Sequence, residues 1–160
     1  MNKTLNAILQ VFILLTPLFL VNLTASIGSC NIIVVPDDYP TIQAAIDAAN
    51  SGDTIIVRDG TYIENVNVYK DDLTIRSENG SKTTIIKAAD TDEDVFKIVS
   101  NNISIHGFTI EGATGIWKSG VYIYKATSCN ISNNVFKSNW FGIRLNHALN
   151  NNLIDNCCVE

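Results

Sequence analysis

The chain has no cluster of basic residues, few helix formers in its second half, and only two histidines. It carries 11 Lys and Arg against 16 Asp and Glu, a net charge of -5, which excludes a basic nucleic-acid-binding surface. Beyond Asn101 no helix pattern separates the short strand-like segments, which excludes a βαβ fold. His106 and His147 stand at no metal-ligand spacing from each other or from the four cysteines, so no metal site is predicted.

Residues 1–29 differ in composition from the rest of the chain. Lys3 precedes an uncharged apolar run over residues 7–23, and the small residues of TASIGS follow. This order predicts a secretory signal peptide. An uncleaved anchor helix is one alternative, because the run could nearly cross a bilayer, and IGSC also resembles a lipobox that would lipidate Cys30. Each interpretation places the remaining chain outside the cytoplasm, secreted or at the cell surface.

A pattern repeats with a period of 22 residues near the end of the chain. GVYIYKATSCNISNNVFKSNWF, residues 120–141, is followed directly by GIRLNHALNNNLIDNCCVE, residues 142–160. Corresponding pairs are Gly120 and Gly142, Val121 and Ile143, Ile123 and Leu145, Ala126 and Ala148, Asn130 and Asn152, and Asn134 and Asn156. Such a period is typical of a solenoid, in which each coil buries its inner face only by stacking on the next.

The repeat length predicts the fold. Three strands of about 4 to 5 residues and three tight turns fill about 22 residues, one coil of an all-β parallel β-helix. With 46% apolar residues, stacked coils can share a sizeable core in one domain. Alternation points Val121 and Ile123 inward, and Tyr122 and Tyr124 outward. In earlier coils we align Phe96 and Ile98 with Val121 and Ile123, Val66 and Val68 with Phe96 and Ile98, and Ile103 with Ile131.

One helix is predicted after the first 29 residues. TIQAAIDAA, residues 41–49, has a capping threonine, Thr41, and its isoleucines and alanines recur on one face. Residues 30–53 form an N-terminal cap that includes this helix, and DGTY is interpreted as a turn. Residues 54–160 form the coils, in which ISIHGFTI and NISNNVF are each interpreted as one short strand. DNCCVE ends within a coil, so we expect an incomplete solenoid whose open edge further coils or a partner would cover.

The cysteines and asparagines are given structural interpretations. A disulfide is permitted in an exported protein, but spacing assigns none among Cys30, Cys129, Cys157 and Cys158. Cys157 and Cys158 replace Val135 and Phe136 in the repeat, so at least one is expected to fill the core. Asparagine tolerates left-handed turns, and its amide can bond the same amide one coil away. We expect one ladder of Asn102, Asn130 and Asn152, and a second of Asn134 and Asn156.

Three asparagines, Asn79, Asn102 and Asn130, also begin N-x-S sequons. The ladder interpretation is favoured for the last two. Asn79 lies in an expected loop and is the candidate for glycosylation.

The segment VPDDYPTIQAAIDAANSGDTIIVRDGTYIENVNV, residues 35–68, resembles the opening of right-handed parallel β-helix proteins of the pectin-lyase-like group. The most similar are exported NosD-type proteins and related carbohydrate-binding and sugar-hydrolase repeat proteins. The resemblance runs from about residue 34 to residue 160. It implies a right-handed solenoid whose first coil is closed by the helix at residues 41–49.

A short piece of this segment fits an enzyme motif. GTYIE, residues 60–64, matches the GxYxE pattern of pectin methylesterases. The Gln-rich segment and the aspartate pair that those enzymes also need are missing. We therefore interpret GTYIE as structural, with Gly60 turning the chain and Tyr62 packing the cap.

The acidic residues do not converge in the way that polysaccharide hydrolysis requires. They fall in loops, and the densest group is Asp90, Asp92, Glu93 and Asp94 in ADTDEDV. Several oxygens so close suggest calcium, but EF-hand spacing is missing, and a solvated acidic loop is the default interpretation. Arg144 is expected to point outward on the face of its sheet with no outward acid to accompany it there. No complete catalytic constellation is predicted.

A surface remains as the candidate functional feature. The outward face of one predicted sheet carries Tyr122, Tyr124, Arg144 and Asn146, with Trp117 and Trp140 in loops beside it. Aromatic rings among polar groups on a stiff face suit stacking against sugar rings. We predict a secreted or cell-surface module that is structural or binds a polysaccharide or surface glycan through these residues. Two alternatives stay open: part of a polysaccharide-degrading lyase, hydrolase or esterase, and a NosD-like copper-related accessory protein.

Overall fold

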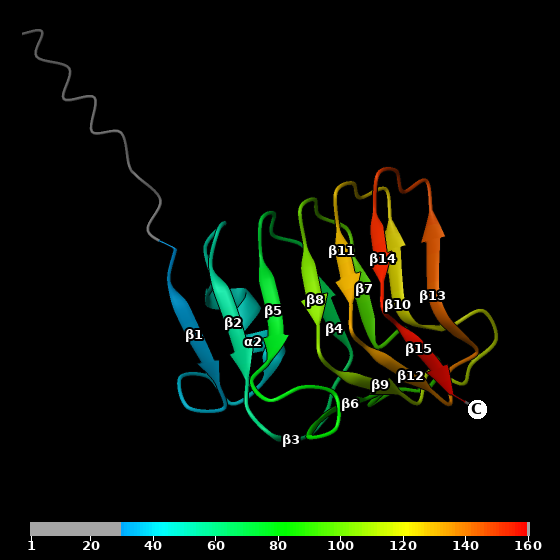
Figure 1. The fold of residues 1–160 in the computed structure, drawn as a ribbon, viewed down its shortest axis with the longest axis horizontal. Coiled ribbons are helices and arrows are strands. Elements are labelled where there is room, and N and C mark those ends of the chain that lie inside the picture. Colours follow the sequence, from blue (N-terminus) through cyan, green and yellow to red (C-terminus); the bar gives the residue numbers. More distant parts are fainter. Residues whose placement is uncertain (1–29, 160) are drawn as a thin grey trace, which may run out of the picture.

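The structure is a computed structural model that describes residues 30–159. The predicted signal peptide lies outside the described residues. Within them the strands stack as parallel coils, a β-solenoid of about 5 turns (Figure 1). The all-β parallel β-helix predicted from the sequence is therefore confirmed. No helix in residues 30–159 has the length and apolar character needed to cross a membrane.

Three sheets form the walls of the solenoid. Sheet A contains β1 (Ile32–Val35), β2 (Thr54–Val57), β5 (Thr74–Ser77), β8 (Ser104–His106), β11 (Asn130–Ser132) and β14 (Asn152–Ile154). Sheet B contains β3 (Gly60–Ile63), β6 (Thr84–Lys87), β9 (Thr109–Glu111), β12 (Val135–Lys137) and β15 (Cys157–Val159). Sheet C contains β4 (Val66–Val68), β7 (Phe96–Ile98), β10 (Ser119–Tyr124) and β13 (Phe141–Asn146). The chain visits A, B and C in turn in each coil.

The core is a column of inward side chains in register. In sheet A a row of isoleucines, Ile55, Ile75, Ile105 and Ile131, is completely buried. In sheet C the predicted pairings of Val121 with Ile143, Phe96 with Val121, and Val66 with Phe96 are all confirmed. Burying such side chains contributes about 1.5–3 kcal/mol each, so the stacked rows are the main stabilising feature.

The repeated glycines make room for the side chains inside the last coils. A Cβ added at Gly120 would lie 2.6 Å from Cδ1 of Phe136, and one at Gly142 would lie 2.9 Å from Sγ of Cys158. Phe136 and Cys158 are register partners on β12 and β15. Cys158 therefore occupies the inward position of its coil, as expected for one of the two adjacent cysteines, while Cys157 pairs with outward Val135. All four cysteines are free thiols.

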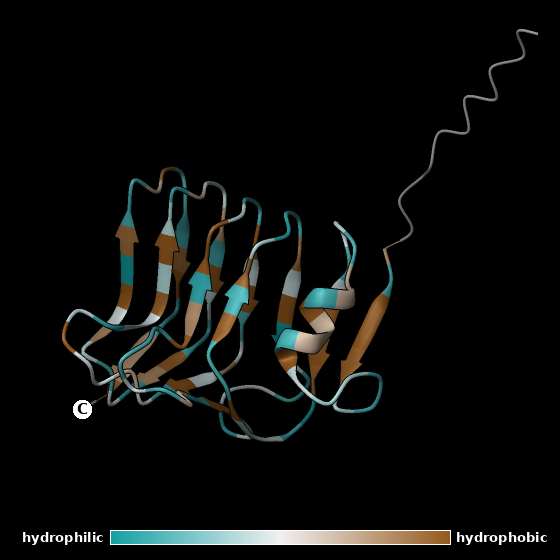
Figure 2. Ribbon diagram, turned by 180° about the vertical axis from the view of Figure 1, so that it is seen from behind, coloured by the Kyte–Doolittle hydropathy of each residue, from teal (hydrophilic) through white to brown (hydrophobic). Residues whose placement is uncertain are grey.

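The single helix of the described residues, α2 (Ile42–Ala48), packs its apolar side against the N-terminal end of the column (Figure 2). Thr41 caps it as predicted, because its side chain accepts a hydrogen bond from the N–H of Ala44 at 3.1 Å. The carboxylate of Glu64 accepts from the N–H groups of Ile42 and Gln43, both at 3.0 Å. The first amides of the helix, which have no partner within it, are thus satisfied by side chains.

Three expectations about local structure are wrong. GTYI, interpreted as part of a turn, is strand β3, whose Tyr62 points toward the core. ISIHGFTI and NISNNVF each form two strands, divided at Gly107 and Asn133, where φ is positive. Ile131 pairs with Ile105 and not with Ile103. The chain between the two paired positions is therefore two residues shorter than the predicted alignment required.

The asparagine ladders are confirmed in part. Asn134 and Asn156 form the expected ladder: Nδ2 of Asn134 donates to Oδ1 of Asn156 at 3.2 Å. The other predicted ladder is wrong. Asn130 and Asn152 are register partners, but Oδ1 of Asn130 is buried and has no hydrogen-bond partner, and on the other side Asn130 pairs with Ser104. Asn102 instead donates from Nδ2 to Oδ1 of Asp72 at 2.8 Å.

The last coil that the structure describes leaves its inward side chains partly uncovered. Leu153 is 44% exposed, whereas its register partner Ile131 is completely buried. Leu145, which pairs with buried Ile123, is exposed in the same way. An inward side chain is therefore covered only when another coil, or the helix α2, lies on each side of it.

Candidate functional site: an aromatic corner beside sheet C

The outward face of sheet C brings the predicted polar and aromatic residues together. In register across this sheet lie Asn67, Lys97, Tyr122 and Arg144. Tyr124 pairs with Asn146 in the next row, and the rings of Tyr122 and Tyr124 lie 6.0 Å apart. Four of the six predicted site residues thus occupy one face of two neighbouring strands, β10 and β13.

Arg144 is the centre of the contacts on this face. Its guanidinium carbon lies 3.8 Å from the centroid of the Tyr122 ring, a close cation–π contact. Nε donates to Oγ of Ser119 at 3.2 Å, and Nη2 lies 3.5 Å from Oδ2 of Asp94. Nδ2 of Asn146 donates to the Tyr122 hydroxyl at 3.2 Å. The guanidinium covers one face of Tyr122, so this ring holds Arg144 in place.

The expectation that no acid accompanies Arg144 is wrong. Asp94 comes from the loop before β7, and its side chain is nearly buried. Its Oδ1 accepts from the N–H of Ser119 at 2.7 Å. The side chain of Asn65 holds the same loop by donating to the carbonyls of Asp90 and Asp94. These contacts hold the loop against sheet C. The alternation of inward and outward residues along a strand could not predict them, because Asp94 lies in a loop.

Trp117 and Trp140 lie at the corner where the chain passes from sheet B to sheet C. Together with Ile116 and Phe141 they form what we call the aromatic corner. Trp117 is 63% exposed and Trp140 is 52% exposed. Trp117 precedes β10 and Trp140 precedes β13, and these two strands are neighbours. The Trp117 ring also packs against Phe141, with centroids 5.9 Å apart. The corner is thus an apolar surface on two successive coils.

Trp117 adopts a strained backbone conformation. Its φ is +66°, a left-handed value that is rare for a bulky residue. Such a conformation costs about 1–3 kcal/mol and persists only where the surroundings hold it. Here the N–H of Gly115 donates to the carbonyl of Thr91 at 2.8 Å. Gly115 also packs so closely against Asp92 that a Cβ at this position would not fit. The acidic loop therefore supports the turn that presents Trp117.

Lysines surround the aromatic residues. Nζ of Lys125 lies 5.0 Å from the centroid of the Tyr124 ring. Lys118 forms an ion pair with Glu93 at 3.2 Å, next to the Trp117 turn. Lys97 is exposed and stands beside Tyr122 in register. Four residues of this surface were not predicted as site residues: Ile116, Phe141, Lys97 and Lys125. A search for apolar residues next to Trp117 and Trp140 in the sequence could have found the first two.

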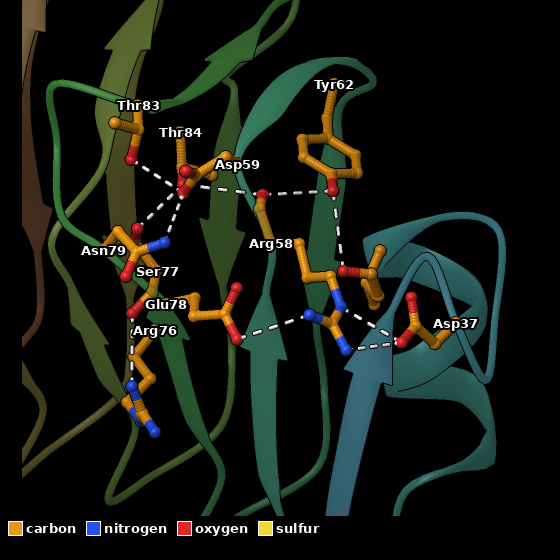
Figure 3. A network of polar contacts seen from close by, with 11 residues as sticks. Asp37, Arg58, Asp59, Tyr62, Arg76, Ser77, Glu78, Asn79, Thr83 and Thr84 are labelled. Atoms are coloured by element: carbon orange, nitrogen blue, oxygen red, sulfur yellow. Dashed lines mark hydrogen bonds and ion pairs between the residues drawn. The ribbon is translucent and has the colours of Figure 1, made fainter.

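The GTYIE motif serves the fold. The Tyr62 hydroxyl donates to the carbonyl of Arg58 at 3.1 Å, and Arg58 in turn pairs with Asp37 at 2.6 Å (Figure 3). Burial is the main cause that raises the pKa of Tyr62. The Glu64 carboxylate is engaged by the amides of α2. These contacts support the structural interpretation of the motif.

The sequon asparagines differ in accessibility. Asn79 is exposed and donates from Nδ2 to Oδ1 of Asp59 at 3.1 Å (Figure 3). Asn130 lies on β11 and is half-buried, and its Oδ1 atom is buried without a hydrogen-bond partner. Asn79 stays the glycosylation candidate.

No group of three His, Cys, Asp or Glu side chains in residues 30–159 is placed to hold a metal ion. In the acidic loop, Asp90 accepts from the N–H of Asp92, Glu93 pairs with Lys118, and Asp94 pairs with Arg144. The calcium site considered for this loop therefore has no cluster of ligands in this part of the chain.

Comparison with solved structures defines the class of the protein as a parallel β-helix. A pectin methylesterase mutant in complex with a hexasaccharide has a TM-score of 0.54 and 14% identity, over 73% of this chain and 48% of that chain. The pectin methylesterase of Aspergillus niger has a TM-score of 0.53 and 18% identity, over 82% and 58%. At these identities the likeness shows a shared fold alone. The chain spans about half the length of these enzymes.

Residues 46–160 match the family model described as periplasmic copper-binding protein (NosD), and the chain belongs to this family. No curated protein matches the chain. The family's periplasmic description is consistent with export. Copper binds thiolate, thioether and imidazole ligands. The described cysteines and histidines do not come together in a set of three, so they do not fit the copper of the family description.

Proposed function

We propose that the chain is an exported β-helix module that binds a polysaccharide or surface glycan through the aromatic corner and the adjoining face of sheet C. The observation that carries this proposal is Trp117, a bulky side chain held in a left-handed conformation with most of its surface in solvent. Strain of this kind is retained where function needs it. The periplasmic description of the family supports an extracytoplasmic role.

The chemistry of the surface suits sugars. Sugar rings have an apolar face of C–H groups and a rim of hydroxyls, and an exposed indole offers a flat apolar surface of matching size. Trp117 and Trp140 would stack against the sugar faces. Arg144 and Asn146, with donors beside the corner, would bind hydroxyl groups at the rim. Because each tryptophan lies one or two residues before a strand of sheet C, the backbone that carries it is held by the neighbouring coils, and little entropy is lost on binding.

The two tyrosines have different roles in this proposal. One face of Tyr122 is occupied by Arg144, so Tyr122 positions the guanidinium. Tyr124 lies farther from the corner, beside Lys125. We therefore expect replacement of Tyr124 to weaken binding less than replacement of either tryptophan.

Tryptophan fluorescence provides a direct test. The chain has two tryptophans, and both are in the aromatic corner, so their emission reports the proposed site without a label. Titration with soluble polysaccharides should change the emission and give a saturable curve. A glycan array of the labelled protein identifies the sugar. Absence of a response to every glycan tested, in both measurements, would contradict the proposal.

The Trp117→Gly variant should weaken glycan binding without a large change in the stability of the fold. Glycine adopts the left-handed conformation without strain, which offsets the lost contact with Phe141, so stability should change by less than about 1 kcal/mol. Glycan affinity should fall about tenfold or more, as for a central aromatic contact. Ile63→Ala, which removes an exposed apolar side chain on sheet B, is the matched control and should leave affinity unchanged. A reducing-end or unsaturated-product assay on the same samples distinguishes binding from cleavage, and turnover would favour the enzyme alternative.

A further inference from the structure

The outward face of sheet A carries a pair of basic side chains in register, away from the aromatic corner. Arg76 on β5 is the direct partner of His106 on β8, and Ser132 on β11 follows next in the same row. Neighbouring strands lie about 4.8 Å apart, and side chains at paired positions point to the same side. The guanidinium and the imidazole therefore project side by side from a rigid surface, and both side chains are half-buried.

The face is free of carboxylates. The outward positions of β1, β2, β5, β8, β11 and β14 are occupied by Ile, Val, Thr, Ser, Asn, Arg and His, and none by Asp or Glu. On sheet B, by contrast, Glu111 stands between two lysines in one row. A cation on sheet A thus has no acidic neighbour on its own face.

Arg76 lacks the acidic partner that other arginines of the described chain have. Arg58 pairs with Asp37 and Glu78, and Arg144 pairs with Asp94. The described contacts of Arg76 are a hydrogen bond from Nη1 to the carbonyl of Ser77 at 3.3 Å (Figure 3) and its repulsion of His106. Most of the donors of this guanidinium therefore remain available.

This arrangement lowers the pKa of His106. Burial lowers its pKa, and the positive charge of Arg76 lowers it further. Of the groups that face it from the two adjacent strands, Arg76 on β5 is charged and Ser132 on β11 is not. At neutral pH the imidazole is mainly neutral, and it gains a second N–H donor and a charge only when a proton binds.

We propose that Arg76 and His106 form a binding site for an oxyanion, a sulfate, phosphate or carboxylate group. The guanidinium presents paired N–H groups to two oxygens, and the imidazolium binds a third. The anion neutralises the repulsion between the two cations, so anion binding and protonation of His106 favour each other. The site is independent of the proposed glycan surface on sheet C.

Proton NMR of the histidine rings tests this proposal on the intact protein. The chain has two histidines, and His147 lies outside sheet A, so it is an internal control. The pH titration of both rings is recorded in chloride, sulfate and acetate at equal ionic strength. Sulfate should raise the pKa of His106 and leave that of His147 unchanged. Acetate should have a smaller effect if the site prefers a tetrahedral dianion, and an equal one if a carboxylate suffices.

Two substitutions sharpen the result. Arg76→Gln should raise the pKa of His106 in chloride by removing the repulsion, and should abolish the additional effect of sulfate. Lys87→Gln on sheet B removes one positive charge elsewhere and should leave both effects intact. Sulfate affinity, measured by calorimetry, should be about tenfold higher at about pH 5.5 than at about pH 8. Equal effects of sulfate on His106 and His147, or a sulfate effect that survives in Arg76→Gln, would overturn the proposal.

Discussion

The N-terminal and C-terminal ends of the described solenoid cover their inward apolar side chains differently. At the N-terminal end, α2 packs on the column, and inward Val35 of β1 is completely buried. In the last coil, inward Leu145 and Leu153 are 40% and 44% exposed. Both ends carry inward apolar side chains, so burial is decided by what lies on either side of a coil. The stability of this fold therefore resides in contacts between coils.

The largest effect should come from shortening side chains in the inward row of sheet A, and we compare a position inside the solenoid with one in its last described coil. Ile131→Ala removes a completely buried side chain and leaves a cavity, so unfolding free energy should fall by about 2–5 kcal/mol. Leu153→Ala acts on its register partner in the last coil and should cost less than about 1 kcal/mol. Urea unfolding followed by circular dichroism measures both. Equal losses would show that the last coil is covered in solution.

A smaller effect is expected from adding a methyl group to the repeated glycines. Gly120→Ala places a methyl 2.6 Å from the Phe136 ring and 2.9 Å from the carbonyl oxygen of Gly142, so it should cost about 1–3 kcal/mol. Gly142→Ala meets Sγ of Cys158, an exposed residue that has room to move. Its cost should be smaller by the same unfolding measurement. The interpretation fails if Gly142→Ala is the more damaging change.

The smallest effect should come from removing the cap of the N-terminal helix. Glu64→Ala deprives the amides of Ile42 and Gln43 of their acceptors, and the expected loss is about 1 kcal/mol. Glu78→Ala is the matched control, because Glu78 forms an exposed ion pair with Arg58 at 3.5 Å. Thermal unfolding of the two variants compares them. A loss from Glu78→Ala as large as that from Glu64→Ala would contradict the capping role.

The repeat predicted the fold and its register where coils have equal length. The period of 22 residues places Val121 beside Ile143 and Asn134 beside Asn156, and both pairings are confirmed. Where loop lengths vary, the alignment of Ile103 with Ile131 was wrong by two residues. Short apolar segments fix which side chains point inward, but loop lengths decide which coil position they reach.

The candidate site was less predictable than the fold. Alternation placed Tyr122, Tyr124, Arg144 and Asn146 on one face, which the register confirms. It could not show that Asp94 reaches Arg144, because that contact joins a loop to a strand two coils away. Nor could it show that Trp117 is strained. These features depend on loop conformation, which carries no periodic signal.

Hydrogen exchange along the chain tests the central claim, that contacts between coils stabilise this fold, most directly. Exchange in peptides is slowest where opening requires global unfolding. Peptides that cover β7 to β11 should exchange slowly, and peptides that cover β14 and β15 should exchange much faster. Uniform protection from β1 to β15, or greater protection in the last coil, would contradict it.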